Sequence, residues 1–303
     1  MTSLARIIGV CARYLSDMTD REWAIIAPLL PPARSGGRPR TIDVCAVVDA
    51  ILFIASSGCQ WRMLPKDFPP RSTVQGYFYD WRDSRLWETL NHLLVMSARE
   101  LEGREASPTA GVIDSQSVKT TESGGISGYD AGKKVNGRKR HIVTDTLGLM
   151  LFVLVHAADV QDRDGAPALL QAIRHRFPWL RHIFADGGYA GRKLRDALKG
   201  QGDWTIEIIK RSDMAQGFEV LPRRWVVERT LAWLGRCRRL AKDWEKTIES
   251  SSAWALVASM RLLSRRRVTK LELVVRASAA EPRPQQAAWA GSRPSASTPR
   301  REV

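Results

Sequence analysis

The chain has 303 residues, which is enough for one large domain or two domains of ordinary size. Hydrophobic residues make up 44% and charged residues 26% of it, as in globular proteins, so it can form a sizeable core. The net charge of +15 excludes an electrically balanced surface and indicates a polyanionic partner, either nucleic acid or an anionic membrane. The alternatives are a merely solvated charged surface, or a genome whose base composition favours arginine codons.

Cysteine spacing and the apolar segments argue against two further classes. The four cysteines are far apart and form neither a CxxC pair nor a Cys/His cluster with the spacing of a zinc site. The apolar segment at residues 44–56 contains Asp49 and is too short to cross a bilayer. Residues 1–11 contain Arg6 and lack the apolar core of a signal peptide. We therefore expect a cytoplasmic protein with reduced cysteines.

The first hundred residues have the pattern of helices joined by short turns. Thr19 or Asp20 is placed to cap the first helix, and Ser72 or Thr73 to cap the third. The predicted helices cover residues 21–30, 43–57, 72–81 and 84–101. A Gly-, Pro- and Arg-rich segment at 33–41 indicates a flexible basic arm. This part is compatible with a helix-turn-helix DNA-binding unit. The alternative is a helical lid without a role in nucleic-acid binding.

From about residue 108 the pattern changes to alternating strands and helices. Strands are predicted at 112–113, 141–144, 150–155, 183–185 and 205–209, with a hairpin turn at 145–148. Helices are predicted at 164–177, 192–199, 223–243 and 252–265. This order indicates a mixed α/β sheet with helices on its faces. The Pro-, Ser-, Ala- and Arg-rich end from about residue 277 is expected to be disordered.

Three acidic residues stand out by their local context. Asp114 follows an apolar strand, and Asp186 ends another beside two glycines. Sites in open α/β sheets form at the carboxyl ends of strands. Glu228 lies within a strongly basic helix. Each residue has an ordinary alternative, since an aspartate after a strand often caps a loop. Glu228 can pair with Arg224 four residues before it.

Three carboxylates in a basic protein suit phosphodiester chemistry. Two Mg²⁺ ions about 3.5–4 Å apart can stabilise both the attacking and the leaving oxygen. Mg²⁺ prefers carboxylate oxygens, with water and substrate phosphate in its other positions. Neighbouring arginines would hold the polyanion and offset the negative charge that develops.

Six ordered segments resemble one family, the insertion-sequence-five family of bacterial transposases. They are MTDREW at 18–23, GCQWR with LP at 58–65, IDSQSVK at 113–119, VQDRDGA at 160–166, ADGGY at 185–189 and RWVVERT at 224–230. The resemblance covers about residues 14–248. It implies an RNase H-like core with a DDE triad of Asp114, Asp186 and Glu228, which would bind two Mg²⁺ ions, with Mn²⁺ as a substitute. Asp114 would bridge the two ions.

The chain departs from one signature of related transposases, Tyr-x2-Arg-x3-Glu-x6-Lys. Arg224 and Glu228 match it, but Leu221 stands at the tyrosine position and Gly235 at the lysine position, beside Arg236. A second-strand step through a DNA hairpin is therefore not implied.

Several other residues could take part in chemistry but have simpler interpretations. His141 and His156 could be bases, although single histidines beside strands are usually packed or hydrogen-bonded. Asp159, Asp162 and Asp164 could form a second metal cluster, but they are better placed to cap the following helix. Trp225 could stack on an unpaired base, and core packing is the simpler use.

We predict four regions from the sequence. Residues 1–13 form an N-terminal extension, 14–101 an all-α helix-turn-helix-like domain, 108–268 an α/β RNase H-like domain, and 269–303 a disordered basic tail. The predicted protein is a transposase that binds the inverted repeats at its element's ends, cleaves them and joins the 3′-OH ends to target DNA. The alternatives are an RNase H-like nuclease that cuts without joining, or an inactive DNA-binding repressor.

The expected partners are double-stranded DNA and a second copy of the chain in a synaptic complex, close to the nucleoid and away from membranes. The basic residues expected to contact DNA are Arg38, Arg40, Lys119, Arg138, Lys139, Arg224, Arg229 and Arg236.

Overall fold

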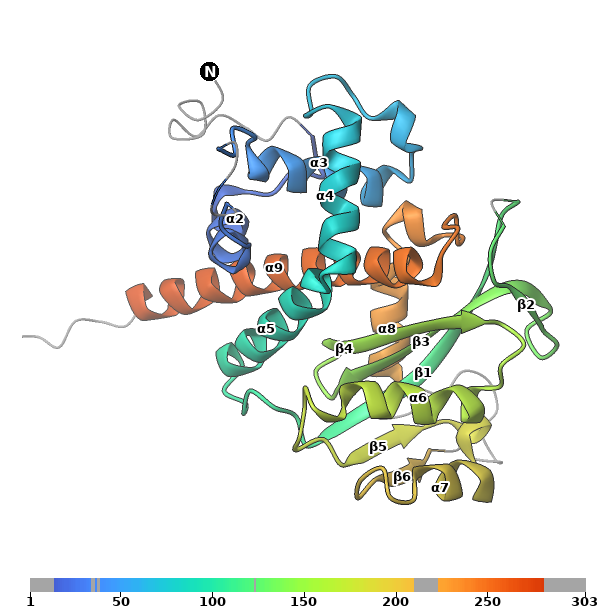
Figure 1. Ribbon diagram of the computed structural model, residues 1–303. Coiled ribbons are helices and arrows are strands. Elements are labelled where there is room, and N and C mark those ends of the chain that lie inside the picture. The colour runs from blue at the N-terminus through green and yellow to red at the C-terminus, as the bar shows by residue number, and fades with distance from the viewer. Residues whose placement is uncertain (1–13, 34–35, 37–38, 123, 210–222, 281–303) are drawn as a thin grey trace, which may run out of the picture.

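The computed structural model describes residues 14–33, 36, 39–122, 124–209 and 223–280, with side chains up to residue 273. Figure 1 shows a helical part and a sheet part, with the long helix α9 running between them. Within these residues, no helix has both the length and the apolar character needed to cross a membrane. The predicted N-terminal extension at 1–13 lies outside the described residues.

The first predicted helix forms, and its cap is Thr19. The Thr19 hydroxyl accepts a hydrogen bond from the backbone N–H of Glu22, whose carboxylate accepts one from the N–H of Thr19. This reciprocal capping box satisfies two backbone donors at the start of the helix. The α-helix α2 (Asp20–Ile26) then continues as the short 3₁₀ helix η1 (Ala27–Leu29).

The second helix, α3 (Val44–Ser57), matches its predicted range closely. The Asp43 side chain accepts hydrogen bonds from two backbone N–H groups of the first turn, and Gly58 follows the helix with a φ of 71°. Glycine adopts this left-handed conformation without the strain that a Cβ would add. Both ends of α3 are therefore encoded by the residues at its ends.

Two further helices, α4 (Arg71–Asp83) and α5 (Leu86–Leu101), complete the helical part. The predicted cap of α4 at Ser72 or Thr73 is wrong, because α4 begins directly after Pro70 and no side chain caps it. The all-helical character of this part is confirmed. A helix-turn-helix unit within it stays a prediction.

Six strands form one mixed sheet, which confirms the predicted α/β class. They are β1 (Ala110–Lys119), β2 (Gly128–Asp130), β3 (Val135–Asp145), β4 (Met150–Ala157), β5 (His182–Ala185) and β6 (Thr205–Ile208). β3 pairs antiparallel with β1, β2 and β4, while β5 pairs parallel with both β1 and β6. β2 was not predicted. β1 is longer than expected, because its second half, beyond the end of β5, still pairs with β3.

Helices cover both faces of the sheet. Figure 1 shows α6 (Asp162–Arg174) in front of the strands and α8 (Trp225–Leu234) behind them, with α7 (Arg192–Leu198) near β6. Both α6 and α7 match their predicted ranges to within three residues. The sheet therefore lies between two helical layers.

The predicted helix over residues 223–243 is wrong beyond Leu234. Instead, the chain turns after α8 and forms the short 3₁₀ helix η4 (Arg238–Leu240). The buried guanidinium of Arg140 on β3 donates hydrogen bonds to the carbonyl oxygens of Leu240 and Lys242, at 2.6 and 3.3 Å. In a continued helix these carbonyl groups would accept hydrogen bonds from the helix backbone; here they accept them from the sheet residue Arg140.

The last helix, α9 (Ile248–Ala280), joins the two parts. It packs on α2, α3, α4 and α5 and also on β4 and α8. The ring of Trp254 stacks on Phe78 of α4 with centroids 4.4 Å apart, and one continuous apolar core includes residues of both parts. The division into domains at 14–101 and 108–268 stays a prediction, but the two parts share this core. The predicted disordered tail begins too early, since the backbone of α9 runs through Ala280; residues 281–303 lie outside the described residues.

Candidate active site

The sheet brings Asp114 and Asp186 to the same level. β1 and β5 run parallel, and Val112 on β1 is the partner of Phe184 on β5. Asp114 and Asp186 each follow two residues later, Asp114 still within β1 and Asp186 directly after the end of β5. The charge of Asp186 is close enough to raise the pKa of Asp114. Two of the three predicted carboxylates are therefore neighbours.

The third predicted carboxylate, Glu228, lies in the first turn of α8 and is linked to Asp186 through Arg224. One Arg224 nitrogen, Nη2, lies 3.2 Å from Oε1 of Glu228 and 3.7 Å from Oδ2 of Asp186. The ion pair expected from the spacing of Arg224 and Glu228 is thus present, and it also reaches Asp186. The Glu228 side chain is 51% exposed, so it can change partner at little cost in burial.

Among the three carboxylates, the negative charge of Asp114 is the least compensated by its surroundings. Its pKa is raised to about 6, mainly by burial and in addition by the nearby charge of Asp186. The backbone N–H of Ser115, 2.7 Å from Oδ1, and the charges of Lys133 and Arg224 act in the opposite direction. A positive charge placed beside such a carboxylate therefore stabilises its ionised form.

The donor set fits a hard divalent cation. Two neighbouring carboxylates, of which one is desolvated and repelled by the other, offer the oxygen ligands that Mg²⁺ and Mn²⁺ prefer. Within the described part of the chain, no group of three or more His, Cys, Asp or Glu side chains is arranged to hold a metal ion. The guanidinium of Arg224 occupies the position between Asp186 and Glu228.

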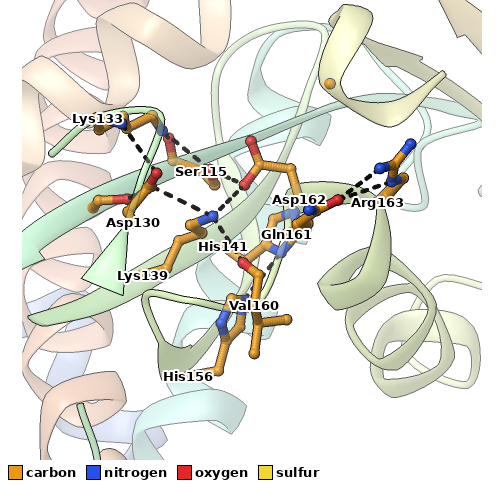
Figure 2. A network of polar contacts seen from close by, with 12 residues as sticks. Ser115, Asp130, Lys133, Lys139, His141, His156, Val160, Gln161, Asp162 and Arg163 are labelled. Carbon is orange, nitrogen blue, oxygen red and sulfur yellow. Dashed lines mark hydrogen bonds and ion pairs between the residues drawn. The ribbon is translucent and has the colours of Figure 1, made fainter. Parts of the chain in front are cut away.

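On the opposite face of β1, a polar network holds Ser115. Since successive residues of a strand point to opposite faces, Asp114 faces α8 while Ser115 faces α6. The Ser115 hydroxyl donates to Oδ1 of Asp162 at 2.7 Å, and Nζ of Lys139 donates to the same oxygen at 2.8 Å (Figure 2). Nζ of Lys133 donates to the carbonyl oxygen of Ser115 at 2.9 Å. Hydrogen bonds to the side chain and the backbone of Ser115 therefore fix β1 next to Asp114.

The roles predicted for the acidic segment before α6 need correction. Gln161, not an aspartate, occupies the N-cap position, and no side chain caps the helix. Asp162 bonds to Ser115 and Lys139, and Asp164 forms an ion pair with Lys193 at 2.8 Å. Among the described residues these aspartates form no metal cluster.

The two histidines are packed and hydrogen-bonded, as expected. His141 is fully buried, and burial lowers its pKa to about 3, which keeps the ring neutral. Its Nε2 lies 2.6 Å from the hydroxyl of Tyr189, and its Nδ1 lies 3.4 Å from Nε2 of His156. A role as a general base is not supported by these partners.

Three of the basic residues predicted to contact DNA are used inside the fold. Arg138 is fully buried and donates to carbonyl oxygens and to Asp243, 3.2 Å away. Lys139 is 4% exposed. The guanidinium of Arg229 lies over the rings of Trp225 and Trp233, at 4.3 and 4.7 Å from their centroids. These placements argue against DNA contacts by Arg138 and Lys139, because neither side chain can reach a ligand without unfolding its surroundings.

The remaining basic residues keep their predicted role as candidates. Arg40, Lys119 and Arg236 are exposed, and Arg224 is partly exposed beside the carboxylates. Arg38 lies outside the described residues. Trp225 is 40% exposed, so it is not a core residue as the simpler interpretation had it.

Sequence reasoning gave no role to Tyr189, Lys133 or Asp130. Tyr189 closes the ADGGY segment, so its proximity to Asp186 could have been noticed. Lys133 and Asp130 come from β2 and the turn after it, which carries little periodicity to reveal it. Lys133 lies near Asp114 because β2, which precedes it, pairs with β3.

Comparison with known proteins gives a consistent result. A family model described as a transposase DDE domain matches residues 105–263, more than half of the chain, and includes all three carboxylates. A second model, described as a putative transposase of the IS4/5 family, matches residues 18–91. A DDE transposase domain implies an RNase H-like fold, with which the mixed sheet agrees.

Two relatives come from Burkholderia cepacia. The putative transposase for insertion sequence element IS402 is 34% identical over 125 residues, which cover 39% of this chain and 58% of the relative. The insertion element IS402 uncharacterized 16.2 kDa protein is 32% identical over 111 residues, which cover 35% of this chain and 74% of that protein. No solved structure matches significantly.

Proposed function

Because the chain belongs to the family of transposase DDE domains, we propose that it is a DNA transposase that acts on the ends of its own insertion sequence. It binds the terminal inverted repeats, cleaves a phosphodiester bond to free a 3′-OH, and joins that end to target DNA. The observation that carries the proposal is the proximity of Asp114 to Asp186, together with the Arg224 guanidinium that links Asp186 to Glu228.

Asp114, Asp186 and Glu228 would hold the divalent cations that this chemistry needs, Mg²⁺ or in its place Mn²⁺. When bound, such ions supply positive charge to the attacking and leaving oxygens of the phosphodiester. Arg224 moves from the carboxylates to the DNA phosphate in this scheme, and so exchanges one anionic partner for another. The network around Ser115 would keep β1 fixed, and Glu228, which is exposed, would be free to turn toward a cation.

The basic surface binds the DNA backbone. Arg40, Lys119 and Arg236 are exposed, so they are available for phosphate contacts. The helical part would recognise the inverted repeat, and two copies of the chain would hold two ends in one complex. The protein would work at the nucleoid of a bacterial cell.

A cleavage assay with a matched binding measurement tests the proposal. A labelled duplex carrying the inverted repeat is incubated with the protein, plasmid DNA and Mg²⁺ or Mn²⁺, and Asp186→Ala serves as the inactive variant. We expect nicking at the repeat end and joining to plasmid, both lost in the variant while DNA binding persists.

Other outcomes separate the alternatives. Cleavage without joining identifies a nuclease, and binding without cleavage in either metal identifies an inactive DNA-binding protein. Cleavage that survives Asp186→Ala contradicts the assigned carboxylates.

A further inference from the structure

Tyr189 is a buried side chain that lies three residues after Asp186. It ends η3 (Gly187–Tyr189), the short 3₁₀ turn that Asp186 begins, and only 1% of its surface is exposed. Within the same turn, Oδ1 of Asp186 accepts a hydrogen bond from the backbone N–H of Gly188 at 2.8 Å. The backbone of this turn therefore sets the direction in which the Asp186 carboxylate points.

The hydroxyl of Tyr189, which also interacts with the side chain of Ser115, bonds to a chain of two histidines whose hydrogen bonds all run in one direction. Nδ1 of His156 lies 2.9 Å from the carbonyl oxygen of Ala157, which can only accept, so Nδ1 carries the proton. Nε2 of a neutral His156 then accepts from Nδ1 of His141, and Nε2 of His141 is left to accept from Tyr189, 2.6 Å away. The phenol proton is thus directed away from the carboxylates and into the fold.

Helix α6 packs directly against the two histidine rings, which Figure 2 shows next to the Asp162 network. A Cβ at Gly165 would lie 2.7 Å from Nδ1 of His141 and 2.8 Å from Nε2 of His156, the two nitrogens that bond to each other. Only glycine lets the helix approach so closely. The same turn of α6 carries Asp162, which holds Ser115 beside Asp114.

We propose that Tyr189 is a positioning residue, which His141 and His156 hold by its hydroxyl so that the turn presents Asp186 to a divalent cation. This assignment rests on the proposed function, because it requires Asp186 to act in catalysis. Tyr189 need not touch DNA or metal. It acts through the backbone of η3, whose other end is the Asp186 carboxylate.

Removing the hydroxyl alone tests the assignment. Tyr189→Phe keeps the buried ring but leaves Nε2 of His141 without a donor and frees the turn. Groups that orient metal ligands typically contribute about 10- to 100-fold to metal affinity or activity. We therefore expect Mn²⁺ affinity, measured by titration of free Mn²⁺, and the single-turnover rate of DNA cleavage both to fall by about tenfold or more. DNA affinity in EDTA should be unchanged.

Three further variants separate positioning from a general loss of stability. Tyr79→Phe removes another tyrosine hydroxyl and its hydrogen bond to Gln75, 3.2 Å long, in the helical part; it should leave Mn²⁺ affinity and cleavage rate unchanged. His141→Gln retains an acceptor for the Tyr189 proton, so this variant should keep most of the wild-type rate of DNA cleavage. His141→Leu has no acceptor and should match Tyr189→Phe, with no further loss when the two are combined.

Nitrogen-15 spectra of histidine-labelled protein give a readout that does not depend on activity. Both His141 and His156 should carry their proton on Nδ1, and Tyr189→Phe should shift Nε2 of His141. The positioning role is overturned if the wild type binds Mn²⁺ and cleaves DNA and Tyr189→Phe equals it in both. If the wild type neither binds Mn²⁺ nor cleaves, the proposed function fails first and the assignment falls with it.

Discussion

The two faces of the sheet treat their charged groups differently. On the face covered by α6, Asp162 accepts hydrogen bonds from both Ser115 and Lys139, and Lys139 is almost fully buried. On the face covered by α8, Asp186 and Glu228 share one guanidinium, and burial together with a neighbouring charge raises the pKa of Asp114. A fold normally compensates its buried charges. On the α8 face the negative charges are compensated incompletely, so a cationic ligand is expected there. The compensated α6 face supports the strand that carries these charges.

The largest effect should come from Glu228, which is needed for chemistry but not for the fold. Glu228→Gln removes one charge from a side chain that is 51% exposed, so the free energy of unfolding should change by less than about 0.5 kcal/mol. DNA cleavage should fall by at least about 10²-fold, because the variant loses charge where the transition state is stabilised.

Glu100→Gln on the exposed surface of α5 is the matched control for this change. It should leave both the cleavage rate and the melting temperature unchanged. A Glu228→Gln protein that cleaves at the wild-type rate would remove Glu228 from the active site.

The opposite result is expected for Asp162, on the compensated face. Asp162→Ala leaves the ammonium of Lys139, whose side chain is almost fully buried, without its closest carboxylate. Removing one partner of a buried ion pair typically costs about 3–5 kcal/mol, and the partial exposure of Asp162 places this variant at about 3 kcal/mol. Urea unfolding measures this loss in the free energy of unfolding.

The control is Asp164→Ala, two residues away, which breaks an ion pair with the 70% exposed Lys193 and should cost less than about 1 kcal/mol. If the two variants lost the same free energy of unfolding, Asp162 would not belong to a face that compensates its buried charges.

The features that could be predicted from the sequence are those that depend only on residues adjacent in the chain. The Thr19 cap, the Asp43 cap and the left-handed Gly58 each depend on a few adjacent residues. Asp114 and Asp186 were found in the same way, because each follows a short apolar strand. The sequence did not show that β5 pairs with β1 in the register that places these two carboxylates side by side.

The basic segment on β3 shows why the remaining residues could not be predicted. Arg138, Lys139 and Arg140 have the composition of a DNA-binding patch, yet β3 is a central strand and all three are buried. The guanidinium groups of Arg138 and Arg140 bind carbonyl oxygens about a hundred residues later in the chain. The same holds for Tyr189 and His141, which meet only when β3 and η3 pack together.

The pH dependence of stability can show how poorly Asp114 is compensated. Its pKa is about 6 in the folded protein, against the usual 3.8 of an unfolded chain, so the folded state binds this proton more tightly. The contribution to stability is complete below pH 3.8 and is lost as the pH rises through 6. In EDTA, Asp114→Asn should therefore be more stable than the wild type above pH 6, by about 2–3 kcal/mol. The difference should vanish below about pH 4, and a gain that is constant with pH would point to packing instead.

The smallest effect tests how closely the supporting face is packed. In Gly165→Ala, the added methyl group would lie 2.7 Å from Nδ1 of His141, so α6 or the histidine pair must move. Overpacking of this kind should cost about 1–2 kcal/mol. Gly76→Ala, in α4, meets no atom within 4 Å and should instead stabilise the protein by about 0.5–1 kcal/mol, because alanine favours a helix. If α6 carries the packing that holds Tyr189, Gly165→Ala must also lower Mn²⁺ affinity, whereas Gly76→Ala must not. A Gly165→Ala protein that loses stability but keeps its Mn²⁺ affinity would separate the packing of α6 from the position of Asp186.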